Sequence, residues 1–297
     1  MKNRDSTHFG YTVIIGRPNV GKSSLLNRIV GSKISITSCK PRTTRCQILG
    51  IKTFRDIQVA YIDTPGFHLE NDKNCSDYIS WKTLQGVDLI IFVIEPYWNE
   101  QDVLVLKQLQ FQSITTPTFL VINKIDRMKN FSELLPLIKK TSFLHPFSAI
   151  IPISVKTGDQ VGILEQKIND QMPKSFFCFS PGQTTDRNDQ FLAIETIREK
   201  LMRFLHREIP YSLKVTISMF QREEKMLSIS AVIWVAREGQ KGIVIGKYGK
   251  WIKKVGITAR VDMEKLFRKK IFLQLWVKLR ENNYPMRWKQ DFNTFCD

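Results

Sequence analysis

The chain has 297 residues, 42% of them hydrophobic, so it is long enough for two domains with sizeable cores. Its formal net charge of +17 indicates a polyanionic partner, either nucleic acid or an acidic membrane surface. The longest apolar run, near residues 89–94, is too short to span a bilayer, and the N-terminus lacks the apolar core of a signal peptide. The five cysteines contain no C-x-x-C pair, which argues against a disulfide framework or zinc site and favours a reduced, intracellular protein.

The positive charge is distributed unevenly along the chain. Residues 1–173 contain 21 Lys and Arg against 15 Asp and Glu, whereas residues 174–297 contain 24 against 13. The shorter C-terminal part therefore holds +11 of the net charge.

A glycine-rich segment follows the first predicted strand, residues 11–15, and precedes a helix-like segment at residues 24–29. It fits G-x-x-x-x-G-K-[ST], and in this context its backbone N–H groups and the helix N-terminus face a phosphate chain. Lys22 would reach the β- and γ-phosphates, and the Ser23 hydroxyl would hold Mg²⁺. The sequence therefore predicts a nucleoside triphosphate site formed by Gly16, Arg17, Pro18, Asn19, Val20, Gly21, Lys22, Ser23 and Ser24.

The next segment, residues 32–46, is polar and basic, and its proline predicts a flexible loop. In the triphosphate state, Thr43 or Thr44 would add a hydroxyl ligand to the metal and order this loop. The sequence does not choose between the two threonines.

Residues 47–54 and 57–62 are strand-like and predict a hairpin. The second strand ends in a D-x-x-G element, at the edge where open α/β sheets bind ligands. Asp63 would bind Mg²⁺ directly or through water, and the Gly66 N–H would meet the γ-phosphate. The predicted nucleotide contacts here are Asp63, Thr64, Pro65, Gly66 and Phe67.

The following segments alternate between strand and helix. Predicted strands cover residues 87–94, 118–122 and 149–153, and predicted helices end near residue 85 or cover residues 100–110, 131–140 and 158–172. Such alternation implies an α/β domain with a mainly parallel sheet and helices on both faces.

The strand 118–122 is followed by the tetrapeptide Asn123-Lys124-Ile125-Asp126, which predicts which nucleotide base the site binds. Guanine presents donors at N1 and N2, which the Asp126 carboxylate can accept together, whereas adenine would leave that carboxylate unpaired. Asn123 would meet the other edge of the base. Lys124 and Lys156 would pack along the base and sugar, and the Val155 N–H would contact O6, within the element Ser154-Val155-Lys156.

Five sequence elements resemble the Ras-like GTPase superfamily in kind and order over about residues 9–172. They are the glycine-rich segment, the loop with Thr43 and Thr44, the D-x-x-G element, the tetrapeptide 123–126 and the element 154–156. Ras-type proteins have a glutamine after D-x-x-G that positions the attacking water, but this chain has Phe67. That substitution resembles the bacterial assembly-factor branch, in which an asparagine at the place of Asn19 supports a potassium ion. The resemblance implies slow intrinsic GTP hydrolysis that needs K⁺ or a partner.

Residues 176–188 are rich in Pro, Gly, Ser and Thr without periodicity, so we predict a linker at 173–189. Beyond it the pattern predicts a small α+β domain at 190–280. Its elements are helix 190–207, strands 212–220 and 226–236, a short helix, a glycine loop, a helix to about residue 269 and strand 271–279. The tail, residues 281–297, has no assignable structure.

An I-G-x-x-G sequence between two helices indicates a type II KH domain, whose loop clamps about four nucleotides of single-stranded nucleic acid. It is not a second phosphate loop, because the spacing from Gly242 is one residue short and an aromatic residue stands where Ser or Thr is needed. Residues 237–289 contain 15 Lys and Arg against 4 Asp and Glu. The predicted RNA contacts are Gly246, Lys247, Tyr248, Gly249, Lys250, Lys253 and Lys254.

A Ras-like GTPase followed by this KH domain resembles the Era family of ribosome-assembly GTPases over nearly the whole chain. The resemblance implies binding to the 3′ end of small-subunit (16S) ribosomal RNA, a role in 30S subunit assembly, and association with the anionic inner membrane face. Tyr248 departs from the small or basic residue usual in the family, and it would either stack on a base or crowd the RNA backbone. Residues outside the nucleotide elements that support the resemblance are 40–45, 185–187 and 197–201.

We therefore predict a cytoplasmic GTPase that binds GTP or GDP with Mg²⁺, and K⁺ as a further ion, and whose nucleotide state adjusts RNA binding. No sequence feature predicts an oligomer, and we expect a monomer. Two alternatives remain open at this point. One is an RNA-binding GTP sensor with negligible turnover, and the other is a peripheral membrane signalling GTPase that uses its basic patch on anionic lipid.

Overall fold

The computed structural model describes residues 7–37, 40, 47–64, 84, 86–111 and 115–280. The chain divides into two compact units. Unit 1 comprises Met1–Ser35 and Thr44–Asp186, and unit 2 comprises Ile36–Thr43 and Arg187–Asp297.

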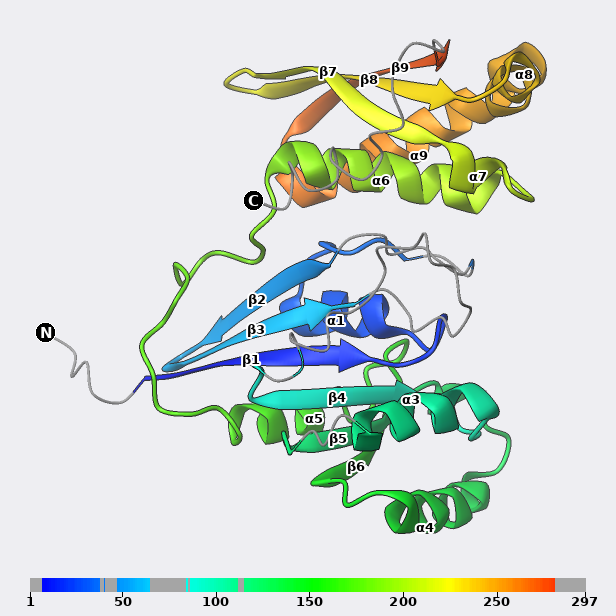
Figure 1. The fold of residues 1–297 in the computed structure, drawn as a ribbon. Helices are drawn as coiled ribbons and strands as arrows, with labels where there is room; N and C mark the ends of the chain where they lie inside the picture. Colours follow the sequence, from blue (N-terminus) through cyan, green and yellow to red (C-terminus); the bar gives the residue numbers. More distant parts are fainter. Residues whose placement is uncertain are drawn as a thin grey trace, which may run out of the picture. The chain divides into compact units, whose positions relative to one another are not determined.

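Unit 1 is built on a six-stranded sheet with the strand order β2-β3-β1-β4-β5-β6 (Figure 1). Only β2 and β3 pair antiparallel, as the predicted hairpin, and the other neighbours are parallel. The mainly parallel sheet is therefore confirmed. Its strands are β1 (His8–Ile15), β2 (Ile48–Phe54), β3 (Ile57–Asp63), β4 (Leu89–Ile94), β5 (Thr118–Ile122) and β6 (Ala149–Pro152).

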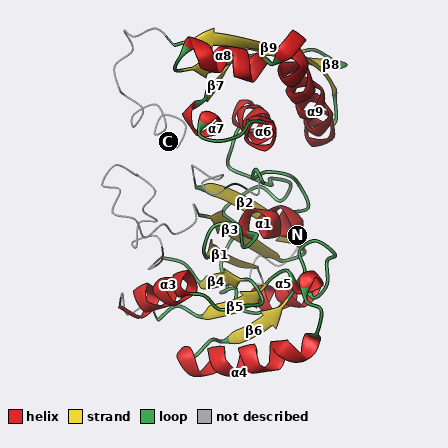
Figure 2. Ribbon diagram, turned by 90° about the vertical axis from the view of Figure 1, so that its right-hand side faces the viewer, coloured by secondary structure: helices red, strands yellow, loops and turns green. Residues whose placement is uncertain are grey.

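Helices cover both faces of this sheet. Figure 2 shows α3 on one side and α1 and α5 on the other. All six side chains of β4 are buried, because a central parallel strand covered on both faces meets no water. The α-helices described in unit 1 are α1 (Lys22–Val30), α3 (Glu100–Phe111), α4 (Leu134–Leu144) and α5 (Val161–Asn169), with single 3₁₀ turns at Ile125–Arg127 and Phe131–Glu133. The helix predicted to end near residue 85 lies outside the described residues.

The segment predicted as a linker joins unit 1 over residues 173–186. The Ile51 N–H donates to the Thr184 carbonyl at 2.8 Å. The Gln58 side chain donates to the Phe179 carbonyl at 2.8 Å and accepts from the Phe179 N–H at 3.0 Å. Paired backbone groups therefore hold this segment, although it has no periodic sequence pattern.

Unit 2 has a three-stranded sheet in the order β7-β8-β9, with β7 and β8 antiparallel and β8 and β9 parallel. Figure 1 shows α6 and α9 on one side of this sheet. The order of elements matches the prediction, except that an unpredicted short helix lies between the predicted helix 190–207 and the first predicted strand, 212–220. The elements are α6 (Asp189–Phe204), α7 (Ile209–Ser212), β7 (Lys214–Arg222), β8 (Met226–Val235), α8 (Glu238–Ile245), a 3₁₀ turn at Lys247–Gly249, α9 (Lys250–Phe267) and β9 (Lys270–Leu279).

The short helix α7 has a simple local cause. Pro210 occupies one of its first two positions, where the missing N–H costs nothing and the fixed φ suits a helix.

Within the described part of the chain, no helix is both long enough and apolar enough to cross a membrane.

The core of unit 1 provides a stability prediction. Phe92 in β4 is fully buried and packs edge-on against Trp98, with ring centroids 6.0 Å apart. We expect Phe92→Ala to lower the free energy of unfolding of unit 1 by about 3–5 kcal/mol, because truncation leaves a cavity. Phe143→Ala is the matched control, since that ring is 80% exposed, and it should change the value by less than about 0.5 kcal/mol. Urea unfolding followed by circular dichroism measures both, and equal effects would contradict this packing.

Candidate functional site

The glycine-rich loop joins β1 to α1, at the carboxyl edge of the parallel strands. Gly16 has φ of +143°, and a Cβ there would lie 2.3 Å from the Val93 carbonyl oxygen. Only glycine therefore fits so close to β4 at this point. Asn19, also in the loop, adopts a left-handed conformation with φ of +66°, which asparagine tolerates better than most residues.

Lys22 begins α1 with its side chain buried beneath this loop. Its Nζ donates to the Gly16 carbonyl at 2.9 Å and to the Arg17 carbonyl at 3.0 Å. Burial lowers the pKa of Lys22 to about 8, with attraction to Asp63 acting the other way and Arg17 lowering it further. The ammonium is thus held at the loop by carbonyl oxygens and is ready to interact with an anion.

Asp63 ends β3 and is completely buried. Its Oδ2 accepts hydrogen bonds from the Ser23 hydroxyl at 2.7 Å and from the Ser35 hydroxyl at 2.8 Å. Burial raises the pKa of Asp63, while the two hydroxyls and the charge of Lys22 oppose that rise. Its Oδ1 is buried and has no hydrogen-bond partner among the described residues.

This arrangement fits a divalent cation. A buried carboxylate oxygen without a partner costs free energy, and a hard cation with oxygen ligands removes that cost. Asp63 and the Ser23 hydroxyl supply such oxygens beside Lys22, which contacts the phosphate chain in the predicted site. The donor set therefore matches Mg²⁺ bound together with a nucleotide.

Two side chains of the predicted base site, Asp126 and Asn123, are held by hydrogen bonds. The exposed Asp126 accepts a hydrogen bond at Oδ1 from the buried Ser154 hydroxyl at 2.6 Å, which orients its carboxylate. Asn123 is buried and donates from Nδ2 to the Val20 carbonyl at 2.8 Å. Its Oδ1 accepts from the Val155 N–H at 3.1 Å. Asn123 therefore ties the phosphate loop to the loop that contains Ser154 and Val155, which we call the base loop.

A charged cluster lies beside the loop. Lys124 donates to the Asn19 carbonyl at 2.6 Å and forms an ion pair with Glu95. Arg17 also contacts Glu95, at 2.8 Å, and its guanidinium lies 5.0 Å from the centroid of the Tyr97 ring. Burial alone would raise the pKa of Glu95, but its contacts with Lys124, Tyr97 and Arg17 outweigh burial and lower that pKa.

In unit 2, the glycine loop joins α8 to α9. A Cβ at Gly246 would lie 2.3 Å from Cδ1 of Trp251, so the loop backbone packs directly on that ring. Tyr248 has φ of +54° and is 96% exposed, and the Lys247 ammonium lies 5.5 Å from the centroid of its ring. The loop leads into the N-terminus of α9, whose dipole and N–H groups favour phosphate oxygens.

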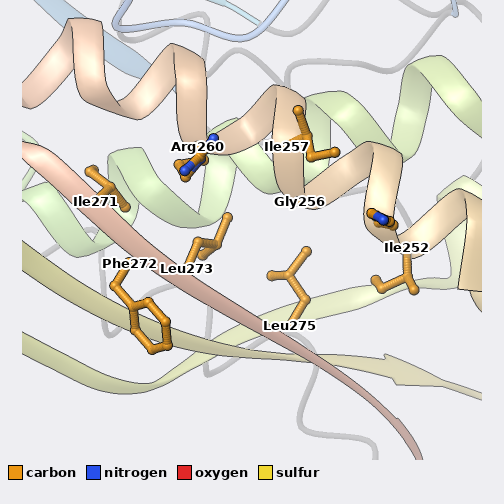
Figure 3. Close-up of a pocket in the computed structure, with 9 residues that line it drawn as sticks. Ile252, Gly256, Ile257, Arg260, Ile271, Phe272, Leu273 and Leu275 are labelled. Carbon is orange, nitrogen blue, oxygen red and sulfur yellow. The ribbon is translucent and has the colours of Figure 1, made fainter.

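A groove next to this loop runs between α9 and β9 and encloses about 420 Å³ (Figure 3). Its walls are mainly apolar, with two basic side chains, Lys253 and Arg260. An apolar channel with positive groups and a glycine loop at its end suits a single strand of nucleic acid. Residues that line it include Ile252, Gly256, Ile257 and Arg260 from α9 and Phe272 and Leu275 from β9.

Comparison with known proteins identifies the family to which the chain belongs. Residues 11–124 match the family model described as "50S ribosome-binding GTPase", and residues 208–283 match the model described as "KH domain". The chain is 60% identical over 278 residues to the GTPase Era of Coxiella burnetii strain Dugway 5J108-111, covering 92% of this chain and 93% of the relative. The chain belongs to the GTPase Era family.

Other Era proteins agree in sequence and in fold. The Era of Pseudomonas entomophila is 44% identical over 284 residues, covering 94% of each chain. A crystal structure of Era in complex with MgGDPNP and nucleotides 1506–1542 of 16S ribosomal RNA has a TM-score of 0.88 at 33% identity, covering 97% of this chain and 98% of that one. A single-substitution variant of Aquifex aeolicus Era bound to GDP·AlF₄⁻ has a TM-score of 0.86 at 33% identity, covering 93% and 95%. The predicted family, fold class and GTPase activity are thus confirmed.

The structure brings most of the predicted Era nucleotide residues together at one edge of the sheet. Thr64 is buried there, and its hydroxyl donates to the Ile14 carbonyl at 2.7 Å. Lys156 is exposed next to the base loop. Thr43, Thr44, Pro65, Gly66 and Phe67 lie outside the described residues, so their predicted contacts stay predictions.

Sequence reasoning missed Ser35, Glu95 and Arg28. Arg28, in the last turn of α1, donates to the carbonyls of Val155 at 3.2 Å and Thr157 at 3.2 Å and so supports the base loop. A signal was available for Glu95, which directly follows β4 at the carboxyl edge of the sheet. For Arg28 and Ser35 there was none, because their partners are 28 or more residues away in sequence.

The lowered pKa of Lys22 predicts a pH effect on nucleotide binding. Above about pH 8 the nucleotide-free protein loses the Lys22 proton, whereas bound phosphates favour the ammonium, so GDP binding should take up a proton. GDP affinity should therefore decrease as the pH rises through 8. Titration calorimetry in buffers of different ionisation enthalpy should show up to one proton taken up at pH 8.5 and less at pH 7.0.

Lys22→Arg is the matched control, because a guanidinium stays protonated over this range. Proton uptake at pH 8.5 that persists in Lys22→Arg would show that another group titrates.

Proposed function

We propose that this GTPase binds GTP and Mg²⁺ in unit 1, hydrolyses the GTP, and holds the single-stranded 3′ end of small-subunit ribosomal RNA with its KH domain during 30S assembly. In this proposal residues 9–172 form the GTPase domain, 173–189 the linker and 190–280 the KH domain. The observation on which it chiefly depends is the buried Asp63 carboxylate, which Ser23 and Ser35 hold at one oxygen while the other lacks a partner among the described residues.

The nucleotide would lie along the carboxyl edge of the sheet. Its phosphates would contact the loop from Gly16 to Ser24 and the Lys22 ammonium. The N1–H and N2–H groups of its base would donate to the Asp126 carboxylate, which the Ser154 hydroxyl already orients. The Val155 N–H and Asn123 hold each other in this structure, so contact with O6 would require the Val155 N–H to be shared or exchanged.

Asp63 and Ser23 would hold Mg²⁺, with Thr43 or Thr44 as a further ligand in the triphosphate state. The bound ion supplies charge neutralisation at the β- and γ-phosphate oxygens. Asn19 already presents its carbonyl to Lys124 and would support K⁺ near the same phosphates. The buried ammonium of Lys22 supplies a second positive charge in a water-poor site, where it acts more strongly than in water.

Hydrolysis would depend on positioning and charge stabilisation, without a covalent intermediate. The amides of the phosphate loop and Gly66 would bind the transferring phosphoryl group. Phe67 cannot orient a water molecule as a glutamine can, so we expect slow turnover without K⁺ or a partner.

For the KH domain, the loop from Gly246 to Gly249 would clamp the RNA backbone while bases enter the groove between α9 and β9. Lys250, Lys253 and Lys254 would pair with phosphates. The Era relative crystallised with MgGDPNP and nucleotides 1506–1542 of 16S ribosomal RNA, similar over 97% of this chain, supports this choice of RNA. The protein would act in the cytoplasm and at the anionic inner membrane face.

The base site predicts a change of specificity. In Asp126→Asn, one acceptor becomes a donor, so the side chain complements xanthine, which has a donor at N1 and an acceptor at C2. We expect GDP affinity to fall by roughly 10- to 150-fold, the loss of hydrogen bonds to a charged group, and xanthosine diphosphate to bind more tightly than GDP. Competition binding measures both. Asp159→Asn, in the same region with its carboxylate on Thr157, should keep the preference for GDP.

The glycine loop predicts a specific loss of RNA binding. Gly249 has φ of +72°, where any side chain brings some strain but aspartate less than most, and a Cβ there would meet only Ile252 at 3.9 Å, so Gly249→Asp should fold. Its carboxylate would repel phosphates and lower affinity for single-stranded RNA by at least about tenfold, with GTP hydrolysis unchanged. Gly239→Asp in α8 adds the same charge in open space and should bind RNA like the unmodified chain. Equal losses in both variants would mean that net charge, and not the loop, determines binding.

A further inference from the structure

The sheet of unit 2 has an outward face with unusual chemistry. Side chains alternate along its strands, and one set, which includes Ile229, Ile233 and Leu275, packs in the core with α6 and α9. The other set points away from that core. It includes three large apolar side chains that are strongly exposed, namely Met219 at 40%, Phe272 at 47% and Trp276 at 55%.

The strand register brings these side chains together. Trp276 on β9 lies opposite Val232 on β8, and Trp234 lies two residues further along β8, so the two tryptophans are diagonal neighbours. Trp234 is half-buried, and its indole N–H donates to the Thr216 hydroxyl at 2.9 Å, which fixes the ring. We call Met219, Trp234, Phe272 and Trp276 the aromatic face.

The charged side chains at the outward positions of the sheet are all positive. Trp234 lies between Lys214 on β7 and Lys278 on β9 in the register of the sheet. None of the outward positions of β7, β8 and β9, all within the described part of the chain, is Asp or Glu. Large exposed apolar groups usually mark a binding surface. A positively charged setting favours a polyanion that also offers flat apolar groups, which is the chemistry of single-stranded nucleic acid.

The aromatic face is continuous with the groove. β9 is an edge strand, paired only with β8 among the described strands. Phe272 lines the groove between α9 and β9, and it also belongs to the outward row of β9 (Figure 3). Trp276 follows four residues later, about 13 Å along the strand. A chain that leaves the groove across β9 would therefore meet Phe272 first and Trp276 next.

We propose that the aromatic face is a second binding site for single-stranded RNA, which continues the groove and stacks bases on Trp276 and Phe272. This proposal rests on the proposed RNA binding of the KH domain. The glycine loop and groove hold about four nucleotides. Nucleotides beyond these four are stacked on the aromatic face, so RNA length decides whether the face contributes to affinity.

The test compares a 4-nucleotide RNA with a 12-nucleotide RNA that extends it, using fluorescence anisotropy with the full chain. Trp276→Ala should lower affinity for the 12-mer by about 5- to 100-fold, the loss of one stacked base, and leave the 4-mer unchanged. Trp276→Phe should restore most of the affinity. Because stacking involves no ion release, Trp276→Ala should keep the salt dependence of binding, whereas Lys278→Ala should make it shallower.

Two controls separate this site from the groove. Phe143→Ala removes an aromatic ring that is 80% exposed on α4 of unit 1, and it should change neither affinity. Gly249→Asp should weaken both RNAs.

Three results would overturn this proposal, and each has a different meaning. If Trp276→Ala binds the 12-mer like the unmodified chain while Gly249→Asp weakens both RNAs, the groove stands and the aromatic face is not an RNA site. If the unmodified chain binds neither RNA, the proposed RNA function fails as well. Sedimentation that shows a dimer dissociated by Trp276→Ala, with RNA binding unchanged, would assign the face to a second copy of the chain and overturn the proposal.

Discussion

The nucleotide site depends on one buried carboxylate. Asp63 is held at the end of β3 by the hydroxyls of Ser23 and Ser35, one from the phosphate-loop helix and one from the segment that follows it. A buried negative charge is costly unless it is paired, and here only Lys22 and the two hydroxyls offset it among the described residues. In the proposed function, a divalent cation at the remaining oxygen would complete the compensation and would link nucleotide, metal and loop conformation.

The two units present groups for phosphate in different ways. In unit 1, the carboxyl ends of parallel strands gather backbone amides and polar side chains at one edge, and Asn123 fastens the phosphate loop to the base loop. In unit 2, two glycines and a helix N-terminus provide the amides, with Trp251 packed beneath Gly246. In the proposed function both loops would bind phosphate through backbone groups, and among the described residues of the two sites the buried acid that would hold a metal is Asp63 of unit 1. This difference would separate a catalytic phosphate site from a purely binding one.

The sequence predicted every described strand and the order of elements, because apolar runs and breakers are local signals. It missed α7, a single helical turn with Pro210 near its start, which lies between the predicted helix 190–207 and the predicted strand 212–220. At the site, the motifs located Lys22, Asp63 and Asp126, but not what holds them. Ser35, Glu95 and Arg28 act through contacts with residues distant in sequence, and the alternation of β9 did not by itself show that Trp276 and Trp234 are neighbours. Such contacts follow from topology, which no single window of sequence contains.

Binding of Mg²⁺ by Asp63 together with the nucleotide is the central claim. The most direct measurement is the rate of GDP release with and without Mg²⁺, in the unmodified chain and in Asp63→Asn. We expect Mg²⁺ to slow release at least about tenfold in the unmodified chain and to have little effect in Asp63→Asn, which lacks the anionic oxygen that a hard cation requires. An equal Mg²⁺ effect in both proteins would contradict this claim, because the metal would then be held without Asp63.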